Sequence, residues 1–192
     1  MVLSADADAR IVTAVLDLLR SRGPGAVTVE SVATLSGVAK TTIYRRYADR
    51  REMLTAALAP LATPLQAPPA PDARQRLHWV IEQAIASVEH GIGFGGMAAL
   101  LTDEDVEFSR LFRSILASYR RQVSAVIDDA KNAGDFRADL DNDILVDAIV
   151  GAYVAERARL GDMADRDRRL FEAFWPTVEN RSRSVHRAEA TD

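Results

Sequence analysis

The feature that most constrains the fold of this chain is a pair of short helical segments joined by one tight turn, within residues 28–47. Thr28 can cap the first segment, whose inner face would carry Val32. A turn signal centred on Gly37 follows, and the second segment holds one inward-facing aliphatic residue, Ile43. The pattern predicts two short helices that meet at a glycine turn and share a small core.

Further helices are predicted on both sides of this pair. Apolar residues at helical spacing begin near Asp8, and the sequence Gly-Pro-Gly at residues 23–25 ends that stripe. After the pair, Asp49 and Glu52 have the spacing of a capping box, which predicts a third short helix over residues 50–59. The start of the chain therefore reads as a small helical domain with a helix-turn-helix at its centre.

The second helix of the pair carries hydroxyls and cations around its single aliphatic anchor. The polar residues in and just after it are Lys40, Thr41, Thr42, Tyr44, Arg45, Arg46, Arg50 and Arg51. The chain as a whole has a formal net charge of -4, so this segment is a local basic patch on an acidic body. Such a helix suits a surface that lies against phosphates. We predict that residues 40–47 form a DNA-reading helix.

The side chains of this helix can be given individual roles. Its first backbone N–H groups can receive a phosphate, and Thr41 and Thr42 add hydroxyl donors. The Tyr44 hydroxyl can reach a phosphate, and Arg45 can bind a guanine edge or a phosphate, two alternatives that the sequence leaves open. The predicted DNA contacts, the last two as backbone clamps, are Thr28, Lys40, Thr41, Thr42, Tyr44, Arg45, Arg46 and Arg50.

The segment resembles the DNA-binding domain of TetR-family transcriptional regulators. The family's Ala-Gly-Val-Ser, Thr-Leu-Tyr, His-Phe and leading Lys correspond here to Ser36-Gly37-Val38-Ala39, Thr42-Ile43-Tyr44, Arg46-Tyr47 and Arg50. The match covers about residues 8–58. It departs at Ala39, where the family's serine would cap the reading helix, a loss of about 1 kcal/mol. Thr41 occupies a position where the family commonly has glycine, and Arg46 one where it commonly has histidine. These two extra donors could alter operator preference.

The remainder of the chain predicts further helices and no strands. The proline-rich sequence PLATPLQAPPAPD cannot continue a helix and predicts a stiff linker. Helical spacing resumes over residues 72–90, 97–101, 105–132, 142–160 and 165–179. The prediction is an all-α chain with a helix-turn-helix domain joined to a C-terminal helical domain. The predicted boundaries are 1–59 for the DNA-binding domain, 60–72 for the linker, 73–179 for the effector-binding and dimerisation domain, and 180–192 for a flexible tail.

The resemblance also implies how the protein would work. It implies a homodimer with two reading heads on a palindromic operator in double-stranded DNA, with half-sites about 34–36 Å apart or a multiple of that. It further implies that the C-terminal domain binds a small-molecule effector and usually releases DNA when it does so.

One helix of the C-terminal half is apolar nearly all round. Residues 144–155, ILVDAIVGAYVA, would have to be covered on two sides, either by a partner chain or as the central helix of a monomer. Together with the last helix, this segment could form the four-helix dimer interface that the resemblance implies. The candidate interface residues are Ala148, Gly151, Ala152, Ala155, Leu170, Phe171, Phe174 and Val178.

Large apolar side chains in the same half are candidates for lining an effector pocket. They are Trp79, Phe94, Met97, Phe108, Phe112, Tyr119, Tyr153 and Trp175. Each of them alone is more typical of a plain core position, but together they predict a hydrophobic or aromatic effector.

Several other kinds of site are not predicted. The chain has no cysteine, and His78, His90 and His186 have no metal-ligand spacing. The glycine spacing of residues 91–96 resembles a dinucleotide motif, but no strand precedes it, so a flexible gate beside the pocket or a simple helix break is expected there. No secretory leader or long apolar run is apparent, which predicts a soluble cytoplasmic protein without a membrane partner. We predict no catalytic residues, metal or cofactor, and no enzyme activity.

Three functions are compatible with these predictions, and a ligand-released repressor is the first of them. A ligand-independent regulator or an activator with the same DNA-binding domain is the second. The third is a helical small-molecule-binding or enzymatic protein, in which residues 1–58 only cap a bundle and their cations form a solvated face.

Overall fold

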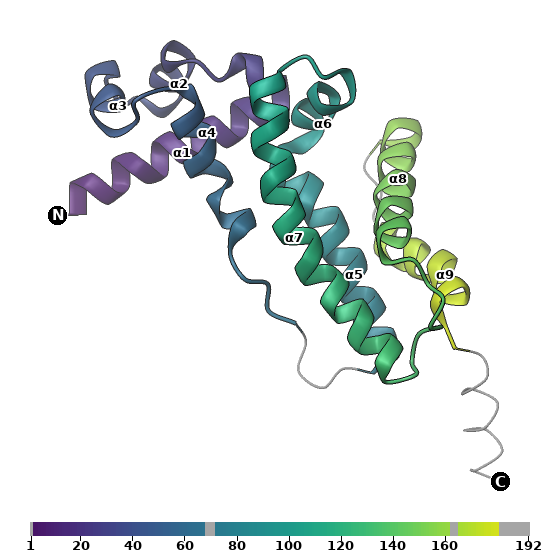
Figure 1. The fold of residues 1–192 in the computed structure, drawn as a ribbon. Coiled ribbons are helices and arrows are strands. Elements are labelled where there is room, and N and C mark those ends of the chain that lie inside the picture. Colours follow the sequence, from purple (N-terminus) through teal and green to yellow (C-terminus); the bar gives the residue numbers. More distant parts are fainter. Residues whose placement is uncertain (1, 68–71, 162–164, 181–192) are drawn as a thin grey trace, which may run out of the picture. The chain divides into compact units, whose positions relative to one another are not determined.

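The computed structural model describes residues 2–67, 72–161 and 165–180, and these are almost entirely helical (Figure 1). No β-strand occurs in them, and one isolated bridge joins Phe136 to Glu179. The prediction of an all-α chain is confirmed. The contacts divide the chain into two compact units, Met1–Thr63 with Ser87–Tyr119 and Pro64–Ala86 with Arg120–Asp192. These units cut the chain differently from the predicted domains, because Ser87–Tyr119 packs with the N-terminal helices.

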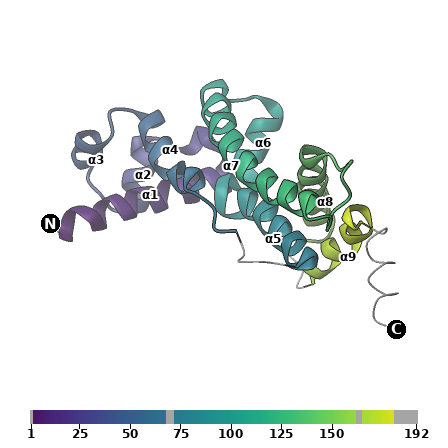
Figure 2. The ribbon, with the colours of Figure 1, turned by 60° about the horizontal axis from the view of Figure 1, so that its bottom comes forward.

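The first unit begins with the predicted helix-turn-helix region. Its elements are α1 (Val2–Arg22), a 3-10 turn (Pro24–Ala26), α2 (Val29–Ser36), α3 (Lys40–Arg46), α4 (Arg50–Leu58) and a second 3-10 turn (Ala59–Ala62). Helices α2 and α4 pack on α1, and α3 packs on α2 (Figures 1 and 2). The first helix begins earlier than the sequence pattern predicted, at Val2 rather than near Asp8.

A single core holds these helices together. Ile11, Val15 and Leu19 of α1 are each 0% exposed, as is the predicted anchor Ile43 of α3. The same cluster takes in Val32 from α2 and Met53, Leu54 and Leu58 from α4. The short reading helix is therefore held by one fully buried residue, which leaves the rest of its surface available.

The predicted helix break over residues 91–96 is only partly correct. A π-helical segment, Ser87–Ile92, carries the break at Gly91, but α6 (Gly93–Thr102) already begins at the second glycine. A Cβ at Gly95 would lie 2.5 Å from the backbone nitrogen of Gly23, and one at Gly93 would lie 2.6 Å from the Cα of Arg20. The glycines thus allow the end of α1 and the start of α6 to touch backbone to backbone.

The second unit is built from α5 (Ala73–Ala86), the part of α7 (Val106–Asn132) that follows Tyr119, α8 (Asn142–Leu160) and α9 (Arg166–Val178). Helix α5 packs on both α8 and α9. Pro176 lies inside the last turn of α9, which ends two residues later. Most of the predicted flexible tail, with His186, lies outside the described residues.

The proline-rich stretch is tied to the second unit. The Leu65 amide donates to the Gln122 side chain at 2.7 Å, and the Trp79 indole donates to the Gln66 carbonyl at 3.0 Å. Residues 64–67 lack helical structure, as the prolines predicted, whereas Ala59–Ala62 still forms a 3-10 turn. Residues 68–71 of the predicted linker lie outside the described part of the chain.

Candidate nucleic-acid interface

The turn between α2 and α3 has the geometry that its glycine predicted. Gly37 ends α2 in the left-handed region, at φ 66°, where a side chain would be strained. The Ser36 hydroxyl accepts a hydrogen bond from the Val38 amide at 3.2 Å, and Arg10 of α1 donates to the Ser36 carbonyl. A Cβ at Gly37 would lie 2.7 Å from the Arg10 guanidinium. Helix α1 therefore braces the turn that sets the angle between α2 and α3.

Caps fix the ends of these short helices as the sequence indicated. The Thr28 hydroxyl accepts from the Ser31 amide at 3.1 Å and starts α2. Ala39 begins α3 with no side-chain cap, so the reading helix lacks that stabiliser. Asp49 accepts from the Glu52 amide at 2.8 Å, and the Glu52 carboxylate accepts in return from the Ala48 amide at 2.6 Å. This exchange fixes where α4 starts and where the chain leaves the reading helix.

The outward face of α3 carries the polar residues that the sequence assigned to DNA. Thr41 and Arg45 are exposed, and Tyr44 is 58% exposed, although tyrosine is usually at least partly covered. Thr42 is half-buried. A short helix with one buried anchor, two exposed donors and an exposed aromatic ring can lie in a major groove and offer hydrogen bonds to phosphates and base edges.

The cations around α3 are less free than the sequence suggested. Lys40 pairs with Glu30 of α2, with 2.7 Å between Nζ and Oε1, and this contact lowers the pKa of the Glu30 carboxyl. Arg46 pairs with Asp8 of α1, and its side chain is only 17% exposed. Burial first and then the Asp8 carboxylate raise the pKa of the neighbouring Tyr47. Two cations of the reading helix are thus held by acids from other helices.

Arg50 differs most from its predicted role as a phosphate clamp. Its guanidinium donates to the carbonyls of Val27 and Pro24, at 3.1 and 2.6 Å, and to the carboxylate of Asp105 at 2.5 Å. These charge-assisted hydrogen bonds hold the Arg50 guanidinium inside the first unit. By contrast, the guanidinium groups of Arg45 and Arg51 contact no other described residue through a hydrogen bond or ion pair. Arg51 was not among the predicted contacts, although the charge run contained it.

The glycine turn, the short helix pair and the exposed donor face together define a helix-turn-helix DNA-binding domain in an all-α chain. Residues 11–57 match the family model described as bacterial regulatory proteins, tetR family. Residues 11–57 therefore carry the N-terminal domain of the tetR family of bacterial regulatory proteins. No curated protein sequence matches the chain.

Solved structures share the fold over most of the chain. A candidate transcriptional regulator from Saccharomonospora viridis in complex with choline has a TM-score of 0.63 at 19% identity, covering 91% of this chain and 98% of that one. FadR from Bacillus subtilis in complex with stearoyl-CoA has a TM-score of 0.58 at 17% identity, covering 85% and 95%. The ketosteroid transcriptional regulator KstR2 of Mycobacterium tuberculosis has a TM-score of 0.56 at 17% identity, covering 90% and 94%. At these identities the likeness establishes the fold alone.

The predicted pocket residues are divided between the two units. Phe108 and Phe112 belong to the core of the first unit, with ring centroids 6.0 Å apart, and Met97 packs against that core. Phe94 is 37% exposed, and Tyr119 is buried, which raises the pKa of its hydroxyl to about 12. The other members, Trp79, Tyr153 and Trp175, lie in the second unit. The effector pocket therefore stays a prediction.

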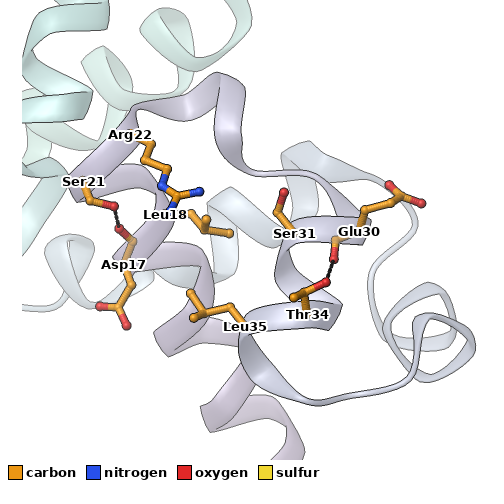
Figure 3. A pocket seen from close by; sticks show the side chains of 8 residues that line it. All are labelled: Asp17, Leu18, Ser21, Arg22, Glu30, Ser31, Thr34 and Leu35. Atoms are coloured by element: carbon orange, nitrogen blue, oxygen red, sulfur yellow. Dashed lines mark hydrogen bonds between the residues drawn. The ribbon is translucent and has the colours of Figure 1, made fainter.

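A hollow that the sequence did not indicate lies between α1 and α2 of the first unit (Figure 3). Its volume is about 570 Å³, and its lining residues are Asp17, Leu18, Ser21, Arg22, Glu30, Ser31, Thr34 and Leu35. The hydroxyls of Ser21 and Thr34 donate to carbonyls of their own helices, those of Asp17 and Glu30, at 2.5 and 2.9 Å. The lining therefore offers charges of both signs and two hydroxyls whose protons are already used.

The predicted dimer residues fall into two groups. Ala148, Gly151 and Ala155 of α8 are exposed and Ala152 is half-buried, and a Cβ at Gly151 would meet nothing within 4 Å. In α9, by contrast, Leu170, Phe171 and Val178 are buried within the second unit, and Phe174 is half-buried. The small-residue face of α8 is open at the surface of its unit, while most of the named α9 side chains already pack inside it.

Two further findings concern sites of other kinds. Within the described ranges, no group of three or more His, Cys, Asp or Glu residues could hold a metal ion. One helical stretch, Ala73–Thr102, is long and apolar enough to span a membrane, but half of its apolar window is buried and it is interrupted at Gly91. A single stretch of this kind is weak evidence for a membrane span.

Proposed function

We propose that this protein is a repressor that binds a palindromic operator and is released from it by a small hydrophobic or aromatic ligand. The observation that carries the proposal is the exposed face of α3, where Thr41, Tyr44 and Arg45 surround a helix whose buried side chain is Ile43. Exposed donors at this spacing serve no purpose in packing, but they match the needs of base and phosphate contacts.

We propose that two copies of the chain pair through α8. Its outward face carries Ile144, which is 65% exposed, followed along the helix by Ala148, Gly151 and Ala155. These small residues would let two helices approach closely, and covering Ile144 would remove a large apolar group from water. A pair of reading heads requires half-sites about 34–36 Å apart or a multiple of that.

The ligand is proposed to be apolar over much of its surface. The structural relatives include proteins solved with choline and with stearoyl-CoA, and one named for ketosteroids. Large apolar side chains are numerous in α5 and α7, which is compatible with a ligand of this class. Binding would act by favouring a conformer whose heads are spaced wrongly for the operator. We further propose that the protein is cytoplasmic, has no cofactor and is not an enzyme.

The proposal is tested by selecting genomic fragments with the purified protein and measuring binding to them by gel shift. Salt-sensitive binding to a few palindromic fragments, including DNA beside its own gene, supports the repressor. The ligand is then sought by screening fatty acyl, steroid and quaternary-amine compounds for release of the DNA. Specific binding that no compound reverses favours a constitutive regulator. Absence of any specific fragment would instead favour a small-molecule-binding protein without DNA function.

A further inference from the structure

Two acids lie where they compete with DNA for the cations of the reading helix. Glu30 of α2 holds Lys40 at the start of α3, and Asp8 of α1 holds Arg46 at its end. Both cations were expected to meet phosphate, because they flank the exposed donors Thr41 and Arg45. The acids come from different helices, and neither is needed to cap α3, whose first residue has no side-chain cap at all.

We propose that Asp8 and Glu30 restrain Arg46 and Lys40, so that DNA of arbitrary sequence meets mainly Arg45 and Arg51, and that they thereby raise the specificity of the head. Phosphate contacts give affinity without sequence information, whereas base contacts give specificity. A cation already paired with a carboxylate gains less from a phosphate, since the acid must first be displaced. An operator that also binds Thr41, Tyr44 and Arg45 gains enough free energy from these contacts to displace the acids from Lys40 and Arg46. Random DNA lacks the base contacts and therefore leaves the ion pairs in place. This inference rests on the proposed DNA-binding function.

The two pairs should differ in strength. Lys40 and Glu30 are 52% and 64% exposed, so water and salt screen their attraction and a phosphate can displace it readily. Arg46 is 17% exposed and Asp8 is 44% exposed, so this pair is better shielded. Asp8 is therefore expected to be the stronger restraint of the two. Arg50 is not one of the cations that DNA is expected to release, because two backbone carbonyls hold its guanidinium in addition to Asp105.

The test uses the full chain with Asp8→Asn or Glu30→Gln and a random-sequence duplex as the probe. Each substitution keeps the size of the side chain and removes one negative charge. The matched control is Asp17→Asn, an exposed acid on the same helix as Asp8 whose carboxylate contacts no described cation. Binding is followed by fluorescence anisotropy over a series of salt concentrations, and thermal melting verifies that each variant is folded.

Each released cation is expected to steepen the slope of log affinity against log salt by about 0.9 per head. At low salt the affinity for random DNA should rise by roughly threefold or more, with Asp8→Asn giving the larger effect. Affinity for a selected operator fragment should change less, so the ratio of specific to random binding falls. In a Lys40→Ala background, Glu30→Gln should have no effect, because its cation is gone.

Several outcomes would overturn the inference. One is that Asp8→Asn and Glu30→Gln leave the salt slope where Asp17→Asn leaves it. Another is that both raise operator and random affinity equally, which would indicate only a general charge effect. Failure of the wild-type protein to bind any DNA would contradict the proposed function itself, and is distinguished by the wild-type titration.

Discussion

The guanidinium of Arg50, at the first residue of α4, lies 2.5 Å from the carboxylate of Asp105, just before α7 begins. The other oxygen of Asp105 accepts from the Phe108 amide at 2.9 Å and caps the first turn of α7. One carboxylate therefore joins α4, which follows the reading helix, to the start of α7, the longest of the described helices. Both residues belong to the first compact unit, so this contact is part of its internal framework.

Arg50→Ala should lower the free energy of unfolding by about 2 kcal/mol, because it removes charge-assisted hydrogen bonds to two carbonyls and one carboxylate. Arg50→Lys should recover only part of this, since an ammonium group cannot reproduce the planar fork. Urea denaturation of the three proteins measures the difference. If Arg50→Ala melts like the wild type but loses DNA binding, the phosphate-clamp prediction from the sequence is the better account.

The same contact predicts a dependence of stability on pH. Burial raises the pKa of Asp105, but the Phe108 amide and the Arg50 guanidinium together outweigh it, and the pKa lies below its ordinary value. A carboxyl with a depressed pKa in the folded state stabilises the fold above the unfolded pKa, about 3.9, and loses this effect as pH falls through the folded pKa.

Asp105→Asn should therefore destabilise the protein by a constant amount from neutral pH to about pH 5. Below about pH 4 the difference from the wild type should shrink. Denaturation curves at stepped pH values measure it. A difference that grows as the solution is acidified would contradict the assignment.

Gly95→Ala should destabilise the first unit by several kcal/mol or prevent folding. The added methyl would lie 2.5 Å from the Gly23 nitrogen and 2.7 Å from the Leu19 carbonyl oxygen, and both are backbone atoms that cannot rotate away. The matched control is Gly25→Ala, whose Cβ would meet nothing within 4 Å. Equal melting temperatures for the two variants would show that α1 and α6 do not touch in this way.

Ala148→Glu should convert the proposed dimer to monomer and weaken operator binding. It would place a charge on the exposed small-residue face of α8, where close approach of a second helix leaves no room for it. Sedimentation equilibrium reports the oligomeric state. Arg110→Ala, at an exposed residue of α7, is the control for a change in surface charge. A variant that remains dimeric would place the interface elsewhere.

Local chemistry was predictable from the sequence, and long-range pairing was not. Thr28, Gly37, Asp49 and the buried Ile43 were identified correctly, because caps, turns and helical spacing act over a few residues. The partner of Arg50 could not be found in this way, since Asp105 is 55 positions further along the chain. The distribution of charged residues along the sequence identified the basic segment. It did not show that Asp8 and Glu30 pair with two of its cations.

The C-terminal half shows the same limit in its apolar residues. The sequence predicted that residues 144–155 of α8 are apolar nearly all round, and Asp147 is the one charged residue among them. Helical spacing correctly predicted that α9 buries Leu170, Phe171 and Val178, but it did not indicate that Gly151 of α8 faces outward. Which side of an almost uniformly apolar helix is covered depends on neighbours distant in sequence. For the same reason the glycines at residues 91–96 appeared to be a break, when three of them begin α6 against α1.

The central claim is that the exposed face of α3 reads DNA, and an anisotropy titration tests it most directly. Wild-type protein and Arg45→Ala are titrated against a selected operator fragment and a scrambled duplex, with Arg110→Ala as control. We predict that the wild type and the control prefer the operator by about a thousandfold or more. Arg45→Ala should lose about 1–3 kcal/mol of operator affinity, and Tyr44→Phe should weaken it as well. Operator binding that is indifferent to both substitutions, or no preference for the operator at all, would contradict the claim.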